Sequence, residues 1–375
     1  MTLNVAIIGC AKIAHLHAKA VLQIPELQFK AVWSRTPESA QKFVDQYAVR
    51  AYSSITEMVK VEHIQIAIIC TAHPYHVNPA VEAMEAGAHV LIEKPLASTL
   101  QDCDLIIEAA RRTGKKAGVV SQRRWYQPIV RMKKAIDEGK IGIPALGTIQ
   151  MLGWRDQSYY DSDAWRGSWK LEGGGVLVNQ SPHQLDLLQW LMGGEIDEIF
   201  GYWGNINHPY IEVEDTAVAL IRFKNGGLGN ILVSNSQKPG IYGKVHIHGS
   251  NGATVGSQPE GGAMFIAGKT TIAEPPKLDL WTVPGEERLM EEWNEVDADE
   301  FHSVDSMTWY FKQQIADFAN AVINNREPLV TAEEGRKTVE IFTAIYRSQR
   351  DGKPVKFPLQ PEYDREDLDG RLTKN

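Results

Sequence analysis

The stretch VAIIGCAKIA at residues 5–14 decides the fold of the first part of this chain. Its apolar half, 5–8, is typical of a buried strand, and the residues after it predict a tight turn and then a helix. The turn reads G-x-A-x-x-A, a variant of the turn that binds dinucleotide pyrophosphate, in which glycine permits the bend and small residues allow close approach. The residues that we expect to contact such a cofactor here are Gly9, Ala11, Lys12, Ile13 and Ala14.

Strands and helices alternate outward from this turn through the first 120 residues. Short β-branched runs at 29–33, 64–70, 89–92 and 116–120 are separated by amphipathic stretches at 13–22, 37–47, 77–86 and 100–113. This order predicts a parallel sheet with right-handed crossovers, covered by helices on both faces. The predicted fold class is α/β, a Rossmann-type doubly wound sheet. Small residues occur in many strand-turn-helix units, but this context favours nucleotide binding at residue 9.

The pattern changes after residue 122, where strands become longer and helices fewer. The predicted strands are 145–153, 196–203, 216–223, 228–234 and 244–248, and the predicted late helices are 307–324 and 332–350. They indicate an α+β domain with a large, mostly antiparallel open sheet. We therefore expect an NAD(P)-binding domain at 1–122 and a substrate-binding and oligomerisation domain at 123–375, with a C-terminal helix able to pack back on the first. Residues 255–300, rich in Gly, Pro and Glu, are predicted to form an extended excursion.

Composition excludes several classes of protein. A length of 375 residues is enough for two domains, and a net charge of -8 argues against general binding to nucleic acid or anionic membranes. The sequence contains no run of the roughly 20 apolar residues that span a bilayer. The amino terminus lacks a basic region, so we expect no secretory signal. Cys10, Cys70 and Cys103 are widely spaced, which is typical of reduced thiols in a cytoplasmic protein and predicts neither disulfides nor a metal site.

A lysine follows the predicted strand at 89–92, in the tripeptide Glu93-Lys94-Pro95. Lysine is rarely buried without a partner, and the carboxyl edge of a parallel sheet faces the crevice where such folds bind ligands. The position therefore favours an active-site lysine, with a solvated surface lysine before a turn as the alternative.

The end of the second predicted strand bears on the choice of dinucleotide. Sites selective for NAD place an acidic residue about 20 positions past the first glycine, to bind the ribose hydroxyl. This chain has Ser34 and Arg35 there instead. Both can contact a 2′-phosphate, which favours NADP slightly, but an arginine stacked on adenine serves NAD as well.

A second polar stretch, GGGVLVNQSPH, occupies residues 173–183. Pro182 places His183 in the first turn of a helix, where the helix dipole favours a neutral imidazole that can accept a proton. Asn179 lies four residues earlier, close enough to share a pocket wall if the turn is helical. The alternative is an ordinary helix start whose histidine makes a local hydrogen bond.

Taken together, these motifs resemble the glucose-fructose oxidoreductase / inositol dehydrogenase / rhizopine-catabolism (Gfo/Idh/MocA) family. The resemblance extends over nearly the whole chain and includes further matches at Thr71 with His76, at Arg124 with Pro128, and in the last helix at 344–348. It implies that Lys94 contacts substrate and nicotinamide and that His183 is the acid/base at the reacting carbinol. It also implies cofactor contacts by Ser34, Arg35, Thr71, His76, Glu93 and Lys94.

One residue departs from the family pattern. The family carries an aspartate four residues before the histidine, and this chain has Asn179, which cannot stabilise an imidazolium by charge. We therefore expect His183 to act as acid/base with Lys94 assisting, while Asn179 orients the substrate. The resemblance implies a sugar or cyclitol substrate, with Arg124, Trp165 and Arg166 as further contacts.

Two other functions stay open. The chain could act on a nucleotide sugar or an aromatic dihydrodiol, or it could be a regulator that binds NAD(P) without turnover. Lys94 and His183 argue against the regulator, and the loss of the aspartate argues weakly for it. We expect a small polyol or sugar as partner, no nucleic acid and no membrane, and a homodimer or homotetramer formed through the open sheet.

Overall fold

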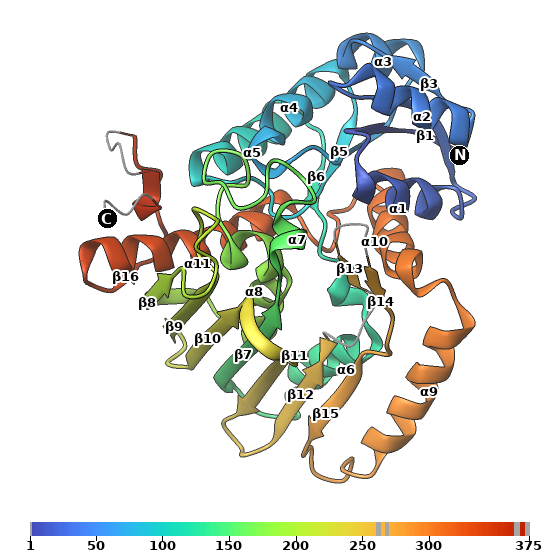
Figure 1. Ribbon diagram of the computed structural model, residues 1–375. Helices are drawn as coiled ribbons and strands as arrows, with labels where there is room; N and C mark the ends of the chain where they lie inside the picture. Colours follow the sequence, from blue (N-terminus) through green and yellow to red (C-terminus); the bar gives the residue numbers. More distant parts are fainter. Residues whose placement is uncertain (1, 260–263, 267–269, 364–367, 372–375) are drawn as a thin grey trace. The chain divides into compact units, whose positions relative to one another are not determined.

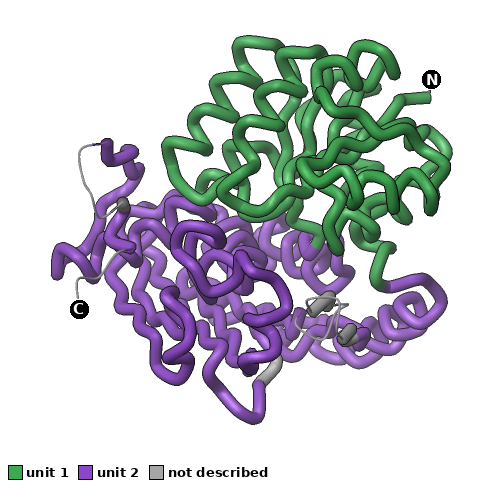
Figure 2. The backbone as a smooth tube through the Cα atoms, turned by 45° about the horizontal axis from the view of Figure 1, so that its top comes forward, with its two compact units in different colours: residues 1–122, 307–337 green, residues 123–306, 338–375 purple. Residues whose placement is uncertain are grey.

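The computed structural model describes residues 2–259, 264–266, 270–363 and 368–371. The chain forms two compact units, each built from two separate segments (Figure 2). Unit 1 comprises Met1–Gln122 and Met307–Lys337, and unit 2 comprises Arg123–Ser306 and Thr338–Asn375. Among the described residues, no helix combines the length and apolar character that crossing a membrane requires.

Unit 1 contains a six-stranded parallel sheet in the order β3-β2-β1-β4-β5-β6 (Figure 1). Its strands are β1 Leu3–Ile8, β2 Leu27–Trp33, β3 Arg50–Tyr52, β4 Ile66–Ile69, β5 His89–Ile92 and β6 Ala117–Val119. Strand β4 is buried along its whole length, as expected for a sheet covered on both faces. The predicted doubly wound sheet is confirmed.

Helices connect these strands, and the sequence determines several of their ends. They are α1 Lys12–Val21, α2 Pro37–Tyr47, α3 Ile55–Val61, α4 Val77–Ala86 and α5 Leu100–Thr113. Ser54 and Thr99 cap the starts of α3 and α5 by accepting hydrogen bonds from the backbone N–H groups of Glu57 and Asp102. Gly114, at a φ of 67°, ends α5 in a left-handed conformation.

The later segment of unit 1 covers the edge of its sheet at β6. Helix α10, Ser306–Ile323, carries Gln314, whose side chain accepts from the Ser121 N–H at 2.8 Å and donates to the Val119 carbonyl at 2.7 Å. Gly118 of β6 packs so closely that a Cβ there would lie 2.9 Å from the carbonyl oxygen of Val330. The segment thus satisfies backbone groups that an uncovered edge strand would expose.

Unit 2 contains an eight-stranded sheet in the order β15-β12-β11-β7-β10-β9-β8-β16. The strands are β7 Pro144–Trp154, β8 Ile196–Gly204, β9 Thr216–Phe223, β10 Leu228–Ser234, β11 Ser236–Gly249, β12 Thr254–Gln258, β15 Lys277–Trp281 and β16 Val355–Lys356. A separate pair joins β13 Met264–Ile266 to β14 Thr270–Ile272. Strands β7 and β10 pair in parallel and the other neighbours in the large sheet are antiparallel, which confirms the predicted mostly antiparallel sheet.

The helices of unit 2 leave one face of this sheet uncovered. They are α6 Gln127–Asp137, α7 Gln157–Tyr160, α8 Pro182–Met192, α9 Leu289–Ser303 and the greater part of α11 Ala332–Asp351. Helix α8 packs on β7, where a Cβ at Gly147 would lie 2.7 Å from side-chain atoms of both Leu188 and Met192. Strand β9 then alternates buried and exposed residues, because helices cover one face of the sheet and leave the other uncovered.

The prediction for residues 255–300 was wrong in part. Instead of an extended excursion, the segment supplies β15 and most of β12 to the large sheet and contains most of the 15-residue helix α9. Trp293 of α9 contacts Trp281 of β15, with ring centroids 5.1 Å apart. A composition rich in glycine, proline and glutamate did not indicate the short strand or the weakly amphipathic helix, because tertiary contacts stabilise both. Residues 260–263 and 267–269 of this segment lie outside the described residues.

Candidate active site

The turn after β1 requires glycine at position 9. Gly9 has a φ of 99°, and a Cβ there would lie 2.7 Å from the backbone nitrogen of Thr71 and 2.8 Å from the carbonyl carbon of Cys70. Its own N–H donates to the Trp33 carbonyl at 2.8 Å. Both the left-handed backbone and the close approach of β4 exclude any larger residue.

The start of α1 fits a dinucleotide phosphate. Ala11, the residue before the helix, has an extended backbone and no polar side chain with which to cap the helix. The first turn, which begins with Lys12 and Ile13, contains no acidic residue. The first N–H groups of the helix and its positive dipole end can therefore face an anion. This geometry fits the cofactor predicted from the sequence.

The end of β2 brings an arginine onto an aromatic ring. The Arg35 guanidinium lies 5.4 Å from the centroid of the Tyr75 ring, and Thr71 donates from its hydroxyl to the Tyr75 carbonyl at 2.9 Å. The Ser34 hydroxyl accepts from the Thr36 N–H at 3.2 Å. Arg35 and Ser34 thus stand together at the strand end, next to the turn that carries Thr71. The sequence did not single out Tyr75.

A buried hydrogen bond between His17 and Glu93 anchors the loop that carries Lys94. Nε2 of His17 lies 2.6 Å from Oε1 of Glu93, and Oε2 of Glu93 accepts from the Lys94 N–H at 3.1 Å. Burial opposes ionisation of Glu93, but the hydrogen bond and charge of His17 bring the pKa of Glu93 below its ordinary value. Glu93 is therefore a carboxylate that holds the loop.

His76 fixes the other side of the same loop. Its Nδ1 lies 3.1 Å from the Pro95 carbonyl and 3.2 Å from that of Leu96, while its Nε2 lies 3.0 Å from the Thr71 carbonyl. The ring is fully buried, and burial lowers the pKa of His76. His76 thereby joins the Lys94 loop to the turn after β4. The contact with a cofactor expected for His76 stays a prediction.

In unit 2, His183 and Asn179 belong to one continuous helical stretch. Val176–Gln180 forms a π-helix, α8 starts at Pro182, and Ser181 between them has helical angles of φ -83° and ψ -8°. Residues four apart on a helix lie on the same face. Asn179 and His183 therefore share a face of this stretch, and the pocket wall expected between them stays a prediction. A π-helical turn is rare and is often associated with functional sites.

Two of the three glycines before this stretch, Gly174 and Gly175, are explained by packing against protein. A Cβ at Gly175 would lie 1.8 Å from the carbonyl oxygen of Glu214, and one at Gly174 would lie 2.6 Å from the hydroxyl of Tyr346. The glycine run thus lets the backbone approach other parts of unit 2.

Three polar side chains converge on the hydroxyl of Tyr159, which the sequence analysis did not identify. Nη1 of Arg166 lies 2.5 Å from it, Nε2 of Gln180 2.7 Å and Nδ2 of Asn179 3.3 Å. The Arg166 guanidinium also lies 4.3 Å from the Tyr159 ring centroid and 4.4 Å from that of Trp165. The structure thus brings Trp165, Arg166 and Asn179, three predicted substrate contacts, into one cluster around Tyr159.

Two buried glutamates adjoin this cluster. Glu172 accepts from the Gly167 N–H at 2.6 Å and from the amide of Asn179. Glu214 accepts from the N–H groups of Gly175 and Leu177, at 2.9 and 3.0 Å. Burial raises the pKa of both carboxyl groups to about 7. The sequence contained no signal for either residue, because isolated glutamates in loops are usually solvated.

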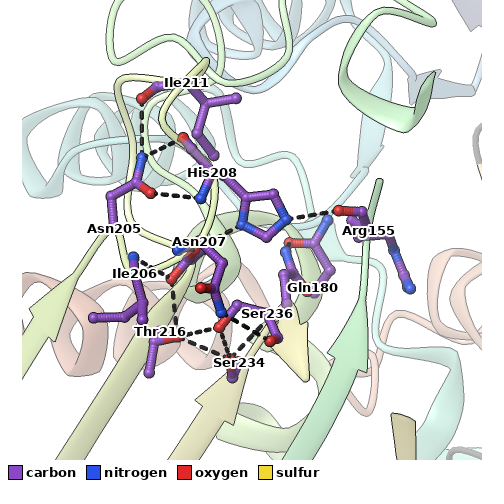
Figure 3. A network of polar contacts seen from close by, with 12 residues as sticks. Arg155, Gln180, Asn205, Ile206, Asn207, His208, Ile211, Thr216, Ser234 and Ser236 are labelled. Atoms are coloured by element: carbon purple, nitrogen blue, oxygen red, sulfur yellow. Dashed lines mark hydrogen bonds and ion pairs between the residues drawn. The ribbon is translucent and has the colours of Figure 1, made fainter. Parts of the chain in front are cut away.

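A further network holds the loop at 205–215 (Figure 3). Nδ1 of His208 lies 2.6 Å from Oδ2 of Asp215, and its Nε2 lies 2.7 Å from the Arg155 carbonyl. Asn235, whose N–H donates to the Asp215 carbonyl at 2.7 Å, also donates from its side chain to Gln180 at 2.9 Å. Hydrogen bonds thus connect this loop to the π-helix that carries Asn179.

Arg124 is paired inside unit 2. Its guanidinium donates to both carboxylate oxygens of Asp186, at 2.9 and 2.6 Å, and lies 4.6 Å from the Trp190 ring centroid. The residue is only 1% exposed. These contacts are those of a structural ion pair, and the predicted contact of Arg124 with substrate stays a prediction. Within the described residues, no cluster of three or more His, Cys, Asp or Glu side chains could hold a metal ion.

Comparison with protein families identifies both parts of the chain. Residues 3–121 match the NAD-binding Rossmann fold of an oxidoreductase family, and residues 133–357 match the C-terminal alpha/beta domain of the same family. These matches confirm the predicted family and the prediction that the protein is an oxidoreductase.

Curated relatives include dehydrogenases of cyclic diols and polyols. The 1-carboxy-3-chloro-3,4-dihydroxycyclo hexa-1,5-diene dehydrogenase of Comamonas testosteroni is 31% identical over 62% of this chain, a match that spans 58% of that relative. The NAD(+)-dependent scyllo-inositol 2-dehydrogenase of Bacillus subtilis (strain 168) is 24% identical over 96% of this chain and 97% of its own length.

Solved structures show the same fold. The WlbA dehydrogenase from Bordetella pertussis, in complex with NADH and UDP-GlcNAcA, has a TM-score of 0.83 and 27% identity, over 96% of this chain and 99% of that one. The myo-inositol 2-dehydrogenase from Lactobacillus plantarum, at 22% identity and a TM-score of 0.74, covers 96% of this chain and all of its own, and supports the fold alone. With both of its domains matched by the family models, this chain belongs to the Gfo/Idh/MocA family of oxidoreductases.

Proposed function

We propose that this oxidoreductase transfers hydride between NAD(P) and a secondary alcohol or ketone of a sugar, cyclitol or sugar derivative. The observation that carries the proposal is the anchored Lys94 loop, in which Glu93 and His76 make buried contacts on both sides of the lysine. A surface lysine needs no such support. The relatives named as inositol and diol dehydrogenases support the same class of substrate.

The protein residues manage the proton in this reaction. Bound NAD(P) supplies the hydride acceptor or donor. During oxidation of the alcohol, His183 takes the hydroxyl proton as a general base, and Lys94 assists in the proton transfer. During reduction, the same groups return the proton to the carbonyl oxygen. Asn179, Trp165 and Arg166 orient the substrate through hydrogen bonds and aromatic contact, with Tyr159 holding their polar groups in place.

For the cofactor, we propose that Arg35 and Ser34 accept NADP at least as well as NAD. The strand end carries no carboxylate to bind a ribose hydroxyl, and the Arg35 guanidinium can neutralise a 2′-phosphate. Its contact with Tyr75 keeps the arginine at the strand end.

A second candidate substrate is a nucleotide-linked sugar. Its support is the likeness, over 96% of this chain, to a dehydrogenase solved with NADH and UDP-GlcNAcA. A larger substrate of this kind needs contacts beyond those proposed for a simple polyol. An aromatic dihydrodiol is a further candidate substrate, because the name of the Comamonas testosteroni relative contains this class of compound.

We further propose that two copies associate through the open face of the large sheet. Five exposed apolar side chains lie at neighbouring or paired positions of β8, β9, β10 and β7. They are Tyr202, Val218, Leu220, Leu228 and Leu146. Leu220 is 67% exposed and Tyr202 57%. Exposed apolar residues gathered on one face of a sheet are typical of an interface, and a second copy of the chain could cover this face through a two-fold axis.

A turnover assay tests the enzymatic proposal. Purified protein is supplied with NAD or NADP and with a panel of inositols, free sugars, UDP-sugars and a dihydrodiol, and NAD(P)H is followed by absorbance. Turnover of one class identifies the substrate. Tight cofactor binding without turnover of any member would contradict the proposal and favour the regulator.

A further inference from the structure

Asn179 contacts a buried carboxylate through the NH2 group of its side-chain amide. Its Nδ2 atom donates to Oε1 of Glu172, which is only 1% exposed. An ionised carboxylate accepts hydrogen bonds and cannot donate them. This contact therefore fixes the orientation of the amide, with the NH2 group toward Glu172 and the carbonyl oxygen directed elsewhere.

Hydrogen bonds and neighbouring charges partly offset the cost of ionising the buried Glu172. Its other oxygen accepts from the Gly167 N–H at 2.6 Å. The charged and titratable groups that interact with it electrostatically include Arg166, Glu214, Tyr159, Tyr160 and Tyr346. Burial raises the pKa of Glu172 to about 7, so its charge changes within the pH range in which dehydrogenases are commonly assayed.

Asn179 connects this carboxylate to the proposed acid/base. The backbone stays helical from Val176 through Ser181 into α8, so Asn179 and His183 lie one turn apart on the same face. An imidazolium formed at His183 is stabilised by an acceptor next to its N–H group. The positioning role requires the carbonyl oxygen of Asn179 to serve as this acceptor while its NH2 group is engaged by Glu172.

We propose that Glu172 is a positioning residue for proton transfer at His183, acting through the amide of Asn179. This inference rests on the proposed function. During alcohol oxidation the hydroxyl proton moves to His183, the hydride moves to NAD(P), and Glu172 stays ionised throughout. In the resemblance described above, an aspartate at position 179 would carry a negative charge next to His183. The carboxylate of Glu172 supplies this charge from further away, with the Asn179 side chain between it and His183. Protonated Glu172 loses this charge and gains an O–H donor, so the amide can turn its carbonyl oxygen toward Glu172 and its NH2 group toward His183, which opposes imidazolium formation.

The experiment compares pH profiles of kcat for alcohol oxidation. The wild type is expected to lose activity as the pH falls below about 7, where Glu172 takes up a proton. This fall in activity is the acid limb of the profile. Glu172→Gln is expected to lower kcat about tenfold or more at pH 8 and to remove the acid limb. Glu172→Asp, the conservative variant, keeps the limb. The double variant Asn179→Asp with Glu172→Gln, which moves the carboxylate to position 179, is expected to recover most of the lost kcat.

Glu214→Gln is the matched control. Glu214 is equally buried and has a similarly raised pKa, but it contacts Gly175, Leu177 and Tyr346 instead of Asn179. This variant is expected to keep the acid limb, moved to lower pH because the charge of Glu214 no longer raises the pKa of Glu172. A second readout needs no turnover: the NMR titration of the His183 ring is expected to move to lower pH in Glu172→Gln.

The outcomes separate the two proposals. Wild-type protein that turns over no alcohol in the panel contradicts the proposed function, and the positioning role falls with it. An active wild type whose profile and His183 titration are unchanged by Glu172→Gln contradicts the positioning role alone. A double variant as slow as Glu172→Gln also contradicts it, because a carboxylate at either position should serve His183.

Discussion

Nε2 of His17 lies 2.6 Å from Oε1 of Glu93, and both side chains are buried in unit 1. Removal of one partner leaves a buried charge without compensation, which costs about 3 to 5 kcal/mol. We expect His17→Ala to lower the free energy of unfolding of the protein by roughly this amount, measured by urea denaturation. His15→Ala is the control, because His15 lies on the same helix but is only half-buried beside Tyr47. Equal losses in the two variants would argue against the anchoring role of the pair.

Lys94→Ala is expected to reduce catalysis and leave cofactor binding largely intact. Loss of a group that acts on the reacting oxygen lowers kcat by about 100-fold or more, while the Kd for NAD(P)H changes by less than about threefold. Lys12→Ala in the phosphate-binding turn should show the opposite pattern, a weaker Kd with a smaller change in kcat. Stopped-flow kinetics and cofactor fluorescence measure both quantities. Unchanged turnover in Lys94→Ala would exclude its catalytic role.

Arg35→Ala separates the two cofactors. Because a guanidinium can pair with the 2′-phosphate of NADP and has no equivalent charge to meet in NAD, its loss should weaken NADPH binding about tenfold and NADH binding much less. Arg50→Ala is the control, since Arg50 lies on the neighbouring strand β3 and pairs with Glu62. Isothermal titration gives the four affinities. Parallel losses for both cofactors would favour stacking on adenine over phosphate recognition.

The buried carboxyl of Glu214 makes stability depend on pH. Below the ordinary glutamate pKa of 4.5 it is protonated in both the folded and the unfolded chain, and it costs nothing. As the pH rises from 4.5 to about 7, the unfolded chain loses this proton first, so the folded state loses stability. Above pH 7 the cost is roughly 3 kcal/mol. Glu214→Gln should therefore gain stability relative to the wild type between pH 4.5 and pH 8.

Urea unfolding at the two pH values measures this gain, and the exposed Glu85→Gln is its control. Glu85 forms a surface ion pair with Arg112, whose contribution is small and changes little over this range. If Glu214→Gln shows the same difference from wild type at both pH values, the carboxyl of Glu214 does not titrate in this window.

Leu220→Lys is expected to dissociate the proposed dimer or tetramer. A charge placed at the centre of an apolar interface must be desolvated when the copies associate. Val296→Lys is the control, because Val296 is also exposed but lies on α9 and outside the sheet face. Sedimentation velocity gives the mass of each variant. A wild type that sediments as a monomer would contradict the interface.

The repeating order of strands and helices made the first sheet predictable from sequence. Apolar runs such as 66–69 are recognisable because a strand buried on both faces needs apolar residues throughout. Gly9 was equally clear, since both its backbone angle and its contact with Thr71 demand glycine. The placement of His183 followed from Pro182, which can occupy the first turn of a helix but not its interior.

The polar partners of the site were not predictable in the same way. Tyr159 and Glu172 lie 20 and 7 residues before Asn179, and nothing in their local sequence indicates burial. Their environment depends on tertiary packing, which a single sequence does not display. Helix α9 was missed for a related reason: its acidic sequence has a weak apolar stripe, and contacts such as that of Asp297 with Arg131 hold it in place.

The covering of β6 by a segment from late in the chain has a consequence for synthesis of the protein. Residues 1–122 leave the ribosome well before Gln314 is made. The backbone groups of Val119 and Ser121 therefore cannot form their hydrogen bonds with Gln314 while residues 123–306 are translated. An uncovered strand edge can pair with other chains in that interval. A fragment that stops at residue 122 would remain in this state, and independent production of the nucleotide-binding unit requires Met307–Lys337 to be joined to it through a linker.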